Sequence, residues 1–340
     1  MKKYTELVAA LLLLPVFFFG QKISVKNDAS QKKVTITIDG KHFTSLVYTD
    51  TMEKPFLYPI MAPNGETITR GFPWNPQPND PVDHPHHIGL WFNYENVNGL
   101  DFWNNSFAIP AEKKKQYGWI RTEQITKTSN GKTGLVEYLA NWTDQQKNVL
   151  LEEKTSLVIA VINKQYVIDR TTTLTAVQDL SFPDAKDGVL GLRVAHELEL
   201  PVKQTKEYKD DKGIVTKVTA NKDATVTGNY LTSEGKQGDA AWGTRGNWCM
   251  MYGKKGADTI SIVMIDHPKN PGYPTYWHAR NYGLFSANPL GQKVFSEGKQ
   301  TMNFKLSKGQ SATFRYRIVI ASGKEKLSAD NIAQLVAGFE

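Results

Sequence analysis

Apolar and polar residues alternate along much of this chain, and this period of two limits its fold more than any other feature. Residues 34–38 alternate Val or Ile with Thr, and residues 312–320 show a similar alternation near the other end. Residues 151–176 predict two long strands that turn near Asn163, and residues 258–266 predict another strand. Because successive side chains of a strand point to opposite faces, the pattern indicates sheets with one buried face.

A convincing helical pattern occurs only near the end of the chain, over residues 328–339. Ser328 can cap this helix, and an apolar stripe follows it, made of Ile332, Leu335, Val336 and Phe339. Many strands and one late helix favour an all-β fold, a large antiparallel β-supersandwich, over a βαβ fold. We expect a single domain over residues 21–340, with a polar excursion at about 203–239 that holds few large apolar residues.

The first twenty residues have the pattern of an export signal. Lys2 and Lys3 precede an apolar run over residues 8–19, and Gly20 offers a small residue for cleavage. The run is about a dozen residues long, whereas a membrane span needs roughly 20, although an uncleaved anchor is the alternative. We therefore expect a periplasmic or secreted protein with a signal peptide at residues 1–20 and no membrane span after cleavage.

Composition excludes several classes of function. The formal net charge of +7 is spread along the chain without the dense Lys/Arg stripe of a nucleic-acid-binding protein. Cys249 is the only cysteine, so no internal disulfide can form, and its apolar neighbours favour a buried strand over a thiol nucleophile. The nucleophile elbow of serine hydrolases and the glycine-rich phosphate loops are absent from the sequence, which disfavours acyl transfer and nucleotide chemistry.

Histidines and aromatic residues gather in a few short segments. Six of the seven histidines lie in such segments, three of them in the run Asp83-His84-Pro85-His86-His87. Histidine exchanges protons near neutral pH, so we predict catalytic roles for His84, His86, His87, His196 and His278. The neighbouring cationic, acidic and aromatic side chains predict substrate contacts by Arg70, Trp91, Asp101, Trp103, Arg193, Trp277 and Arg280.

Three interpretations of the histidine run stay open. In acid–base chemistry on a sugar, Asp83 or Glu197 would be the carboxylate partner, although strand alternation would turn Glu197 away from His196. As a metal site, His84 and His86 could bind a divalent ion, although Pro85 disrupts regular strand geometry, and we predict no cofactor. In the third interpretation the histidines are core residues bonded to the backbone, and a residue such as Asp101 only ties down a turn.

Two motifs resemble those of the DUF6807 family of exported bacterial proteins. The first is His84-Pro85-His86-His87 with the aromatic residues that follow it, and the second spans Asp266-His267-Pro268 to Asn288-Pro289. Members often carry the label of a methane oxygenase subunit (PmoA), a multi-helix membrane protein that this chain does not match. The family is similar to the galactose mutarotase-like supersandwich, which implies a carbohydrate site on a concave sheet face.

In mutarotase-like enzymes an arginine precedes the histidines, and a late carboxylate acts as the base. Arg70, then His86 or His87, then His196 match that order, and Glu297 is the candidate for the carboxylate. The resemblance and the residues together predict an exported carbohydrate-active protein that performs epimerisation, hydrolysis or elimination on a sugar or sugar acid. The alternatives are a non-catalytic carbohydrate-binding module and a metal-dependent enzyme with histidine ligands.

Overall fold

The computed structural model describes residues 21–202, 206–209, 215–218 and 223–339, and its main feature is a pair of eight-stranded antiparallel sheets. The first sheet has the order β1 (Ile23–Asp28), β2 (Lys33–Ile38), β3 (Lys41–Val47), β4 (Phe56–Leu57), β5 (Leu90–Tyr94), β11 (Gly188–Arg193), β18 (Leu284–Asn288) and β17 (Tyr276–Ala279). The second has the order β14 (Asn229–Thr232), β15 (Trp248–Lys255), β16 (Asp258–Asp266), β20 (Ser311–Gly323), β9 (Gln165–Ala176), β8 (Val149–Ile162), β7 (Gly134–Thr143) and β6 (Trp119–Ser129).

The remaining elements are short. Two further pairs of strands are β10 (Leu180–Phe182) with β19 (Phe304–Leu306), and β12 (Lys206–Lys209) with β13 (Val215–Val218). The α-helices are α1 (Gln292–Phe295) and α2 (Ala329–Ala337), and the 3₁₀ helices are η1 (Ala111–Gln116), η2 (His196–Leu198) and η3 (Gly238–Ala241). The prediction of an all-β antiparallel sandwich with one C-terminal helix is confirmed, and the four-residue helix α1 was not predicted.

Local sequence signals explain where several elements begin and end. β8 and β9 form the predicted hairpin, and both turn residues, Asn163 and Lys164, have positive φ (50° and 69°), as in a type I′ turn. Ser328 caps α2, since its hydroxyl accepts a hydrogen bond from the backbone N–H of Asn331 at 3.2 Å. β16 spans the residues predicted for that strand.

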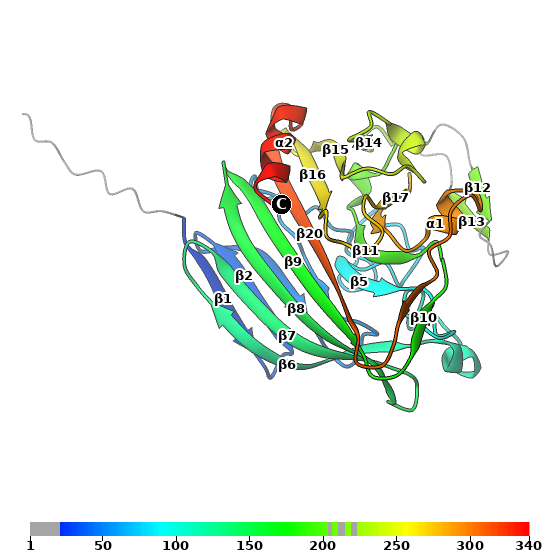
Figure 1. The fold of residues 1–340 in the computed structure, drawn as a ribbon. Helices are drawn as coiled ribbons and strands as arrows, with labels where there is room; N and C mark the ends of the chain where they lie inside the picture. The colour runs from blue at the N-terminus through cyan, green and yellow to red at the C-terminus, as the bar shows by residue number, and fades with distance from the viewer. Residues whose placement is uncertain (1–20, 203–205, 210–214, 219–222, 340) are drawn as a thin grey trace, which may run out of the picture.

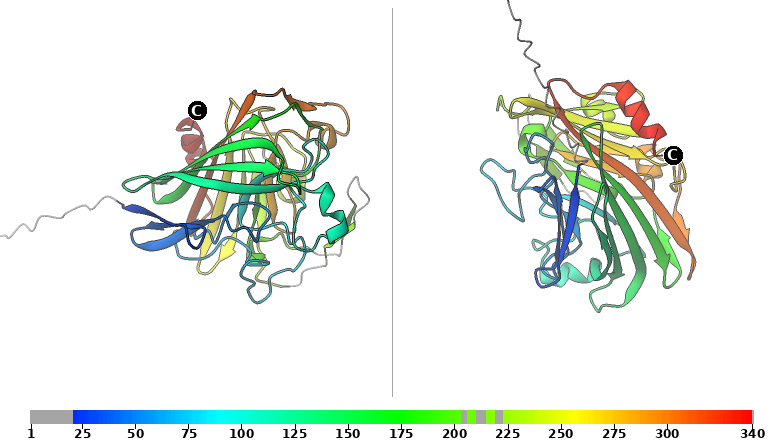
Figure 2. Two further views of the ribbon diagram at one scale, coloured as in Figure 1. Left: turned by 90° about the horizontal axis from the view of Figure 1, so that it is seen from below. Right: turned by 90° about the vertical axis from the view of Figure 1, so that its left-hand side faces the viewer.

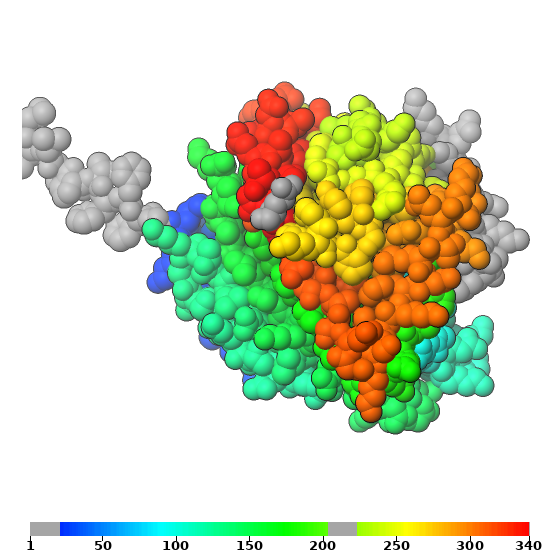
Figure 3. All heavy atoms as spheres, in the orientation of Figure 1, coloured from blue at the N-terminus to red at the C-terminus, as the bar shows by residue number. Residues whose placement is uncertain are grey.

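The sheets face one another and enclose the main apolar core (Figures 1 and 2). Each long strand contributes alternate residues to this core, for example Leu157 and Ile159 of β8. The edges approach each other on one side, because Ile23 of β1 forms an antiparallel bridge with Gly131, between β6 and β7. On the outer face of the second sheet, α2 buries Ile332 and Leu335, and Figure 3 shows this helix at the surface beside β16.

The polar excursion is only partly described. Residues 203–205, 210–214 and 219–222 lie outside the described residues, as does the predicted export signal at residues 1–20. Within the described part, β12 and β13 form a small hairpin, and β14 belongs to the second sheet as an edge strand. None of the described helices has the length and apolar character that would let it cross a membrane.

Candidate functional site

The candidate site lies on the face of the first sheet that is turned away from the main core. Along β5 and β11, Leu90 and Leu192 enter the core between the sheets, whereas Trp91 and Arg193 point to the opposite face. Gly191 pairs with Trp91, and a Cβ on Gly191 would lie 2.5 Å from the Trp91 ring. The glycine therefore provides the space that the large aromatic side chains occupy on this face.

Arg70 holds the histidine run, residues 83–87, in place through hydrogen bonds to its backbone. Its backbone N–H bonds to the carbonyl of Arg193, which places the two arginines side by side. The Arg70 guanidinium donates to the carbonyls of Asp83 (2.8 Å), His84 (2.9 Å) and His87 (2.9 Å), and its side chain is fully buried. Burial and the neighbouring Arg193 lower the pKa of Arg70 to about 9, which keeps it protonated at neutral pH.

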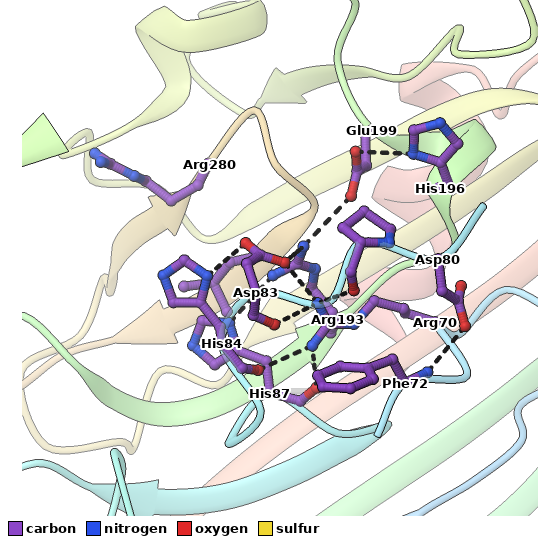
Figure 4. A network of polar contacts seen from close by, with 12 residues as sticks. Arg70, Phe72, Asp80, Asp83, His84, His87, Arg193, His196, Glu199 and Arg280 are labelled. Carbon is purple, nitrogen blue, oxygen red and sulfur yellow. Dashed lines mark hydrogen bonds and ion pairs between the residues drawn. The ribbon is translucent and has the colours of Figure 1, made fainter. Parts of the chain in front are cut away.

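Asp83 contacts two arginines and one histidine in a charged network (Figure 4). One carboxylate oxygen accepts from Arg70 at 2.8 Å and from Arg193 at 2.9 Å, and the other contacts Nδ1 of His84 at 2.5 Å. Burial alone would raise the pKa of Asp83, but Arg193, His84 and Arg70 outweigh it and hold that pKa well below its usual range. The carboxylate therefore orients His84 with Nδ1 as the donor, and Nε2 becomes its basic nitrogen.

A second histidine–carboxylate pair is attached to the same arginine. Glu199 accepts from Arg193 at 3.4 Å through one oxygen, and its other oxygen lies 3.1 Å from Nδ1 of His196. Asp223 lies 3.5 Å from Nε2 of His196. The hydrogen bond to Glu199 is the main cause that raises the pKa of His196, whereas burial lowers the pKa of His84. The two imidazoles thus have opposite tendencies to hold a proton.

Stacked and edge-to-face rings surround the Asp83–His84 pair. We call this group the aromatic wall; it consists of His84, His86, His87, Trp91 and Tyr282. His84 stacks on both Tyr282 and His87, with ring centroids 4.8 Å apart in each case, and His87 stacks on Trp91 at 5.3 Å. His86 meets His87 edge to face at 4.2 Å. Burial lowers the pKa of both His86 and His87 well below the usual value, so both imidazoles are neutral at physiological pH.

Lys54 is a buried cation in contact with this wall. Its ammonium group donates to the carbonyls of His86 at 2.8 Å and Trp103 at 3.4 Å, and it lies 5.3 Å from the centre of the Trp91 ring. Burial lowers the pKa of Lys54 to about 8. Lys54 therefore ties the histidine run to the turn that carries Trp103.

A small cavity opens beside the second pair. Its volume is about 190 Å³, and its lining includes Thr69, Asp80, His196, Glu197 and Lys255. Since a water molecule takes about 30 Å³ of liquid volume, the cavity has room for a small polar group. His196 therefore borders a space that a substrate could enter.

Most of the predicted site residues come together here, but their roles differ. The structure gathers His84, His86, His87, His196, Arg70, Arg193, Trp91 and Trp103 at one place. Arg70 and Arg193 are fully buried and bind carboxylates and backbone carbonyls of the protein itself. These two arginines therefore position other residues and do not present a surface to a substrate.

The other predicted residues lie around this cluster. Asp101 accepts from the backbone N–H groups of Trp103 and Asn104, both at 2.9 Å, so it stabilises a turn. Trp277 packs in the core between the sheets. His278 is buried on β17, with Nδ1 3.4 Å from Asp187. Arg280 is half-buried to one side of the network in Figure 4, with its guanidinium carbon 5.8 Å from the Tyr282 ring centre.

The carboxylate partners differ in part from the sequence-based candidates. Asp83 does pair with a histidine, but Glu197 forms an ion pair with Lys255, and Glu297 lies exposed in a turn. Glu199, Lys54 and Tyr282 were not predicted. A 3₁₀ turn begins at His196, so Glu199, three positions later, returns to the same side as the histidine. The spacing of three residues between His196 and Glu199 is therefore a sequence signal for this pair.

The predicted metal alternative has no preformed set of ligands in the described part of the chain. Among these residues, no three His, Cys, Asp or Glu side chains are arranged so that they could hold a metal ion. The Nδ1 atom of His84 contacts Asp83, and the rings of His84 and His86 meet edge to face with centroids 5.6 Å apart.

Comparisons with known proteins give one family and several distant structures. A model of a family of unknown function (DUF6807) matches residues 33–337. A search among curated proteins finds no match. A GH36 α-galactosidase from Geobacillus stearothermophilus is 11% identical with a TM-score of 0.39, and the match covers 89% of this chain but 41% of the galactosidase. The chain therefore spans about two fifths of that enzyme's length.

Two other solved structures are matched over most of their own length. A galactose mutarotase-like protein from Clostridium acetobutylicum is 10% identical with a TM-score of 0.42, and the match covers 89% of this chain and 98% of that protein. The Slr1438 protein from Synechocystis is 8% identical with a TM-score of 0.39, with 89% and 96% covered.

Proposed function

The chain belongs to the DUF6807 family, whose function is unknown, and on that premise we propose a function from the site itself: acid–base chemistry on a sugar or sugar acid. One observation carries the proposal. Two histidine–carboxylate pairs, Asp83–His84 and Glu199–His196, are joined through the single guanidinium group of Arg193. Proton transfer at a sugar centre needs an acid and a base held in fixed positions, and the shared arginine supports both pairs.

The two histidines take different roles in this proposal. His84 has a lowered pKa and a carboxylate that fixes its tautomer, so it acts as the base through Nε2. His196 has a raised pKa and is the proton donor. Environments that push the pKa values of two groups apart are typical of an acid and base that work together. Epimerisation, hydrolysis and elimination all need such a pair.

The surroundings of the pairs support a polar, ring-shaped substrate. His84 and His86 are half-buried and present imidazole rings, and Arg280, next to the buried Tyr282, adds a positive charge that would favour a sugar acid. The small cavity next to His196 supplies hydroxyl and carboxylate groups from Thr69 and Asp80. Arg70 and Lys54 would act as positioning residues, since both hold the histidine run through its backbone carbonyls.

Turnover by paired histidine variants tests the proposal. Wild-type protein is incubated with oligosaccharides, aryl glycosides and their uronic acid counterparts, and products are followed by NMR. His84→Asn and His196→Asn should each lower the turnover of a converted substrate by about 10²–10⁴-fold, the contribution of a positioned acid or base. His42→Asn is the control, because His42 lies exposed on β3 and contacts Ser45.

The outcomes separate the alternatives. Unchanged turnover in both site variants would contradict the proposal, provided that their melting temperatures match that of wild type. Saturable sugar binding without product would favour a non-catalytic binding module. Activity that a chelator abolishes and a divalent ion restores would favour a metal-dependent enzyme with histidine ligands.

We also propose that the protein is exported to the periplasm or secreted. The support is the sequence pattern of residues 1–20, with two lysines, an apolar run and Gly20 before Gln21. Cell fractionation followed by N-terminal sequencing tests this. A periplasmic chain that starts at Gln21 is the expected result, and an intact chain confined to the cytoplasm would contradict it.

A further inference from the structure

A second and larger cavity lies away from the histidine pairs, where one edge of the second sheet meets loops of the first. Its volume is about 680 Å³. The lining comes from the start of β6, the end of β7 and the turn after it, and from two loop residues of the first sheet, Lys32 and Asp50. Small-molecule sites commonly have volumes of about 300–1,000 Å³, so the size fits a ligand of one to a few rings.

Irregular strand pairing shapes this cavity. The register between β6 and β7 shifts between Thr122 and Gln124, and the register between β7 and β8 shifts between Trp142 and Thr143. Such bulges bend a strand and often occur next to functional sites. Thr122 lines the cavity, and its hydroxyl oxygen is buried without a hydrogen-bond partner among the described residues.

The charged side chains around the cavity balance one another. Three cations and three anions line it, so their formal charges sum to zero: Lys32, Arg121 and Lys147 against Asp50, Glu123 and Asp144. Lys32 pairs with Asp50, and Arg121 donates to the backbone carbonyls of Asp50 and Met52. An ionic ligand would therefore find little net attraction here.

The uncharged side chains that line the cavity include one tryptophan ring and several amide and hydroxyl groups, and these are left to contact a ligand. Trp119 opens β6 and is half-buried in the lining. Asn141 and Thr143 of β7 lie in the same lining, and Asn141 is paired with Arg121 across the two strands. An indole plane with amide and hydroxyl groups around it matches the C–H face and hydroxyl rim of a sugar. We infer that this cavity is a second site, which binds a neutral glycan.

This second site is connected to the first through the chain. Asp50 lines the cavity, and Lys54, four positions later, holds the histidine run. A glycan in this cavity would therefore lie next to the segment that supports the histidine run. The inference itself rests on the cavity and does not need turnover at those pairs.

Affinity electrophoresis tests the inference without reference to catalysis. Wild-type protein is run through native gels that contain galactomannan, xyloglucan or dextran as neutral probes, and polygalacturonate as an acidic one. We expect retardation by at least one neutral polysaccharide and none by polygalacturonate. Trp119→Ala should weaken that retardation by about tenfold or more, which corresponds to about 1.4 kcal/mol, and Asn141→Ala should weaken it to a smaller extent.

Two controls make the result specific. Trp248→Ala removes another half-buried tryptophan at the start of a strand of the same sheet, on the face that α2 covers, and should leave retardation unchanged. His84→Asn should also leave it unchanged, which separates this site from the proposed catalytic one. Absence of retardation by every neutral probe, or full retardation of both Trp119→Ala and Asn141→Ala, would overturn the inference.

Discussion

At the scale of single residues, His84 has a strained backbone conformation. Its φ of 44° lies in the left-handed region, which costs a residue with a side chain about 1 kcal/mol or more. The contacts that hold it there include the Arg70 bond to its carbonyl, the Asp83 contact to Nδ1 and the Tyr282 stack. Strain that the surroundings hold in this way is common at functional sites, and here it orients the imidazole ring.

The charge of Asp83 should matter more for stability than that of an ordinary surface aspartate. In Asp83→Asn the buried guanidinium groups of Arg70 and Arg193 lose the carboxylate that both contact. We expect the free energy of unfolding to fall by about 2 kcal/mol, which is less than the roughly 3–5 kcal/mol of a fully buried pair, because the Asp83 side chain is 37% exposed and solvent screens its charge. Urea unfolding measures this change.

A surface pair serves as the control for that variant. Asp50→Asn removes an aspartate whose partner, Lys32, is also exposed, and such pairs contribute about 0–1 kcal/mol. Equal losses in the two variants would mean that Asp83 contributes no more than a solvated ion pair. The network drawn in Figure 4 would then not hold the histidine run.

At the scale of elements, the site depends on the pairing of β5 with β11. The register sets Gly191 opposite Trp91 and Leu192 opposite Leu90, so one face receives the aromatic wall and the other joins the core. A shift by one residue would exchange these faces. Strand register therefore decides whether Trp91 lies beneath His87 or between the sheets.

A methyl group at Gly191 should disturb the wall directly. In Gly191→Ala the new Cβ would lie 2.5 Å from the Trp91 ring and 2.8 Å from the Trp103 ring, which is closer than van der Waals contact. We expect a loss of about 1–3 kcal/mol in the free energy of unfolding, as for other overpacked sites. Tryptophan fluorescence should change as well, since both rings must move.

Gly323→Ala is the matched control for this prediction. Gly323 is likewise a strand glycine, at the end of β20, but the nearest atom to an added Cβ is a carbonyl oxygen at 3.6 Å, an ordinary contact. Its stability should stay close to that of wild type. If Gly191→Ala were equally harmless, the wall would be loosely packed and could not position His87.

At the scale of the whole molecule, the sandwich keeps several histidines neutral by burying them. Burial is the main cause that lowers the pKa values of His86, His87 and His278 well below 6.5. Below about pH 6.5 the unfolded chain therefore binds more protons at these positions than the folded chain does. Their contribution to stability is present above that pH and is lost as the pH falls.

One buried carboxyl group works in the opposite direction. Burial raises the pKa of Asp266 to about 7, so its folded form holds a proton that the unfolded form has lost, and this favours the folded state at lower pH. His196, whose pKa is raised, acts in the same direction as Asp266, whereas burial also lowers the pKa values of His42 and His84. The five histidines with lowered pKa values outweigh the two opposing groups, so we expect the melting temperature to fall between pH 6.5 and 5. Calorimetry over this range measures the change. A constant or rising melting temperature would show that the histidines are not kept neutral in the folded protein.

Much of the fold could be predicted from sequence because its signals are local. The hairpin of β8 and β9, the strand β16 and the Ser328 cap each depend on neighbours a few positions away. The irregular elements were harder to predict. β11 ends at Arg193 and a 3₁₀ turn begins at His196, and this turn brings Glu199 to the histidine.

By itself the sequence determined that the chain forms antiparallel sheets and that histidines gather with aromatic residues, because alternation and clustering are properties of adjacent positions. Only the tertiary structure decided which carboxylate meets which histidine. Asp83 and Glu199 are 116 residues apart, and they share Arg193 because strand pairing and loop packing bring them together. Burial decided the roles of two arginines. Arg70 and Arg193 were expected to bind a substrate, but they lie inside the protein and hold other residues in position.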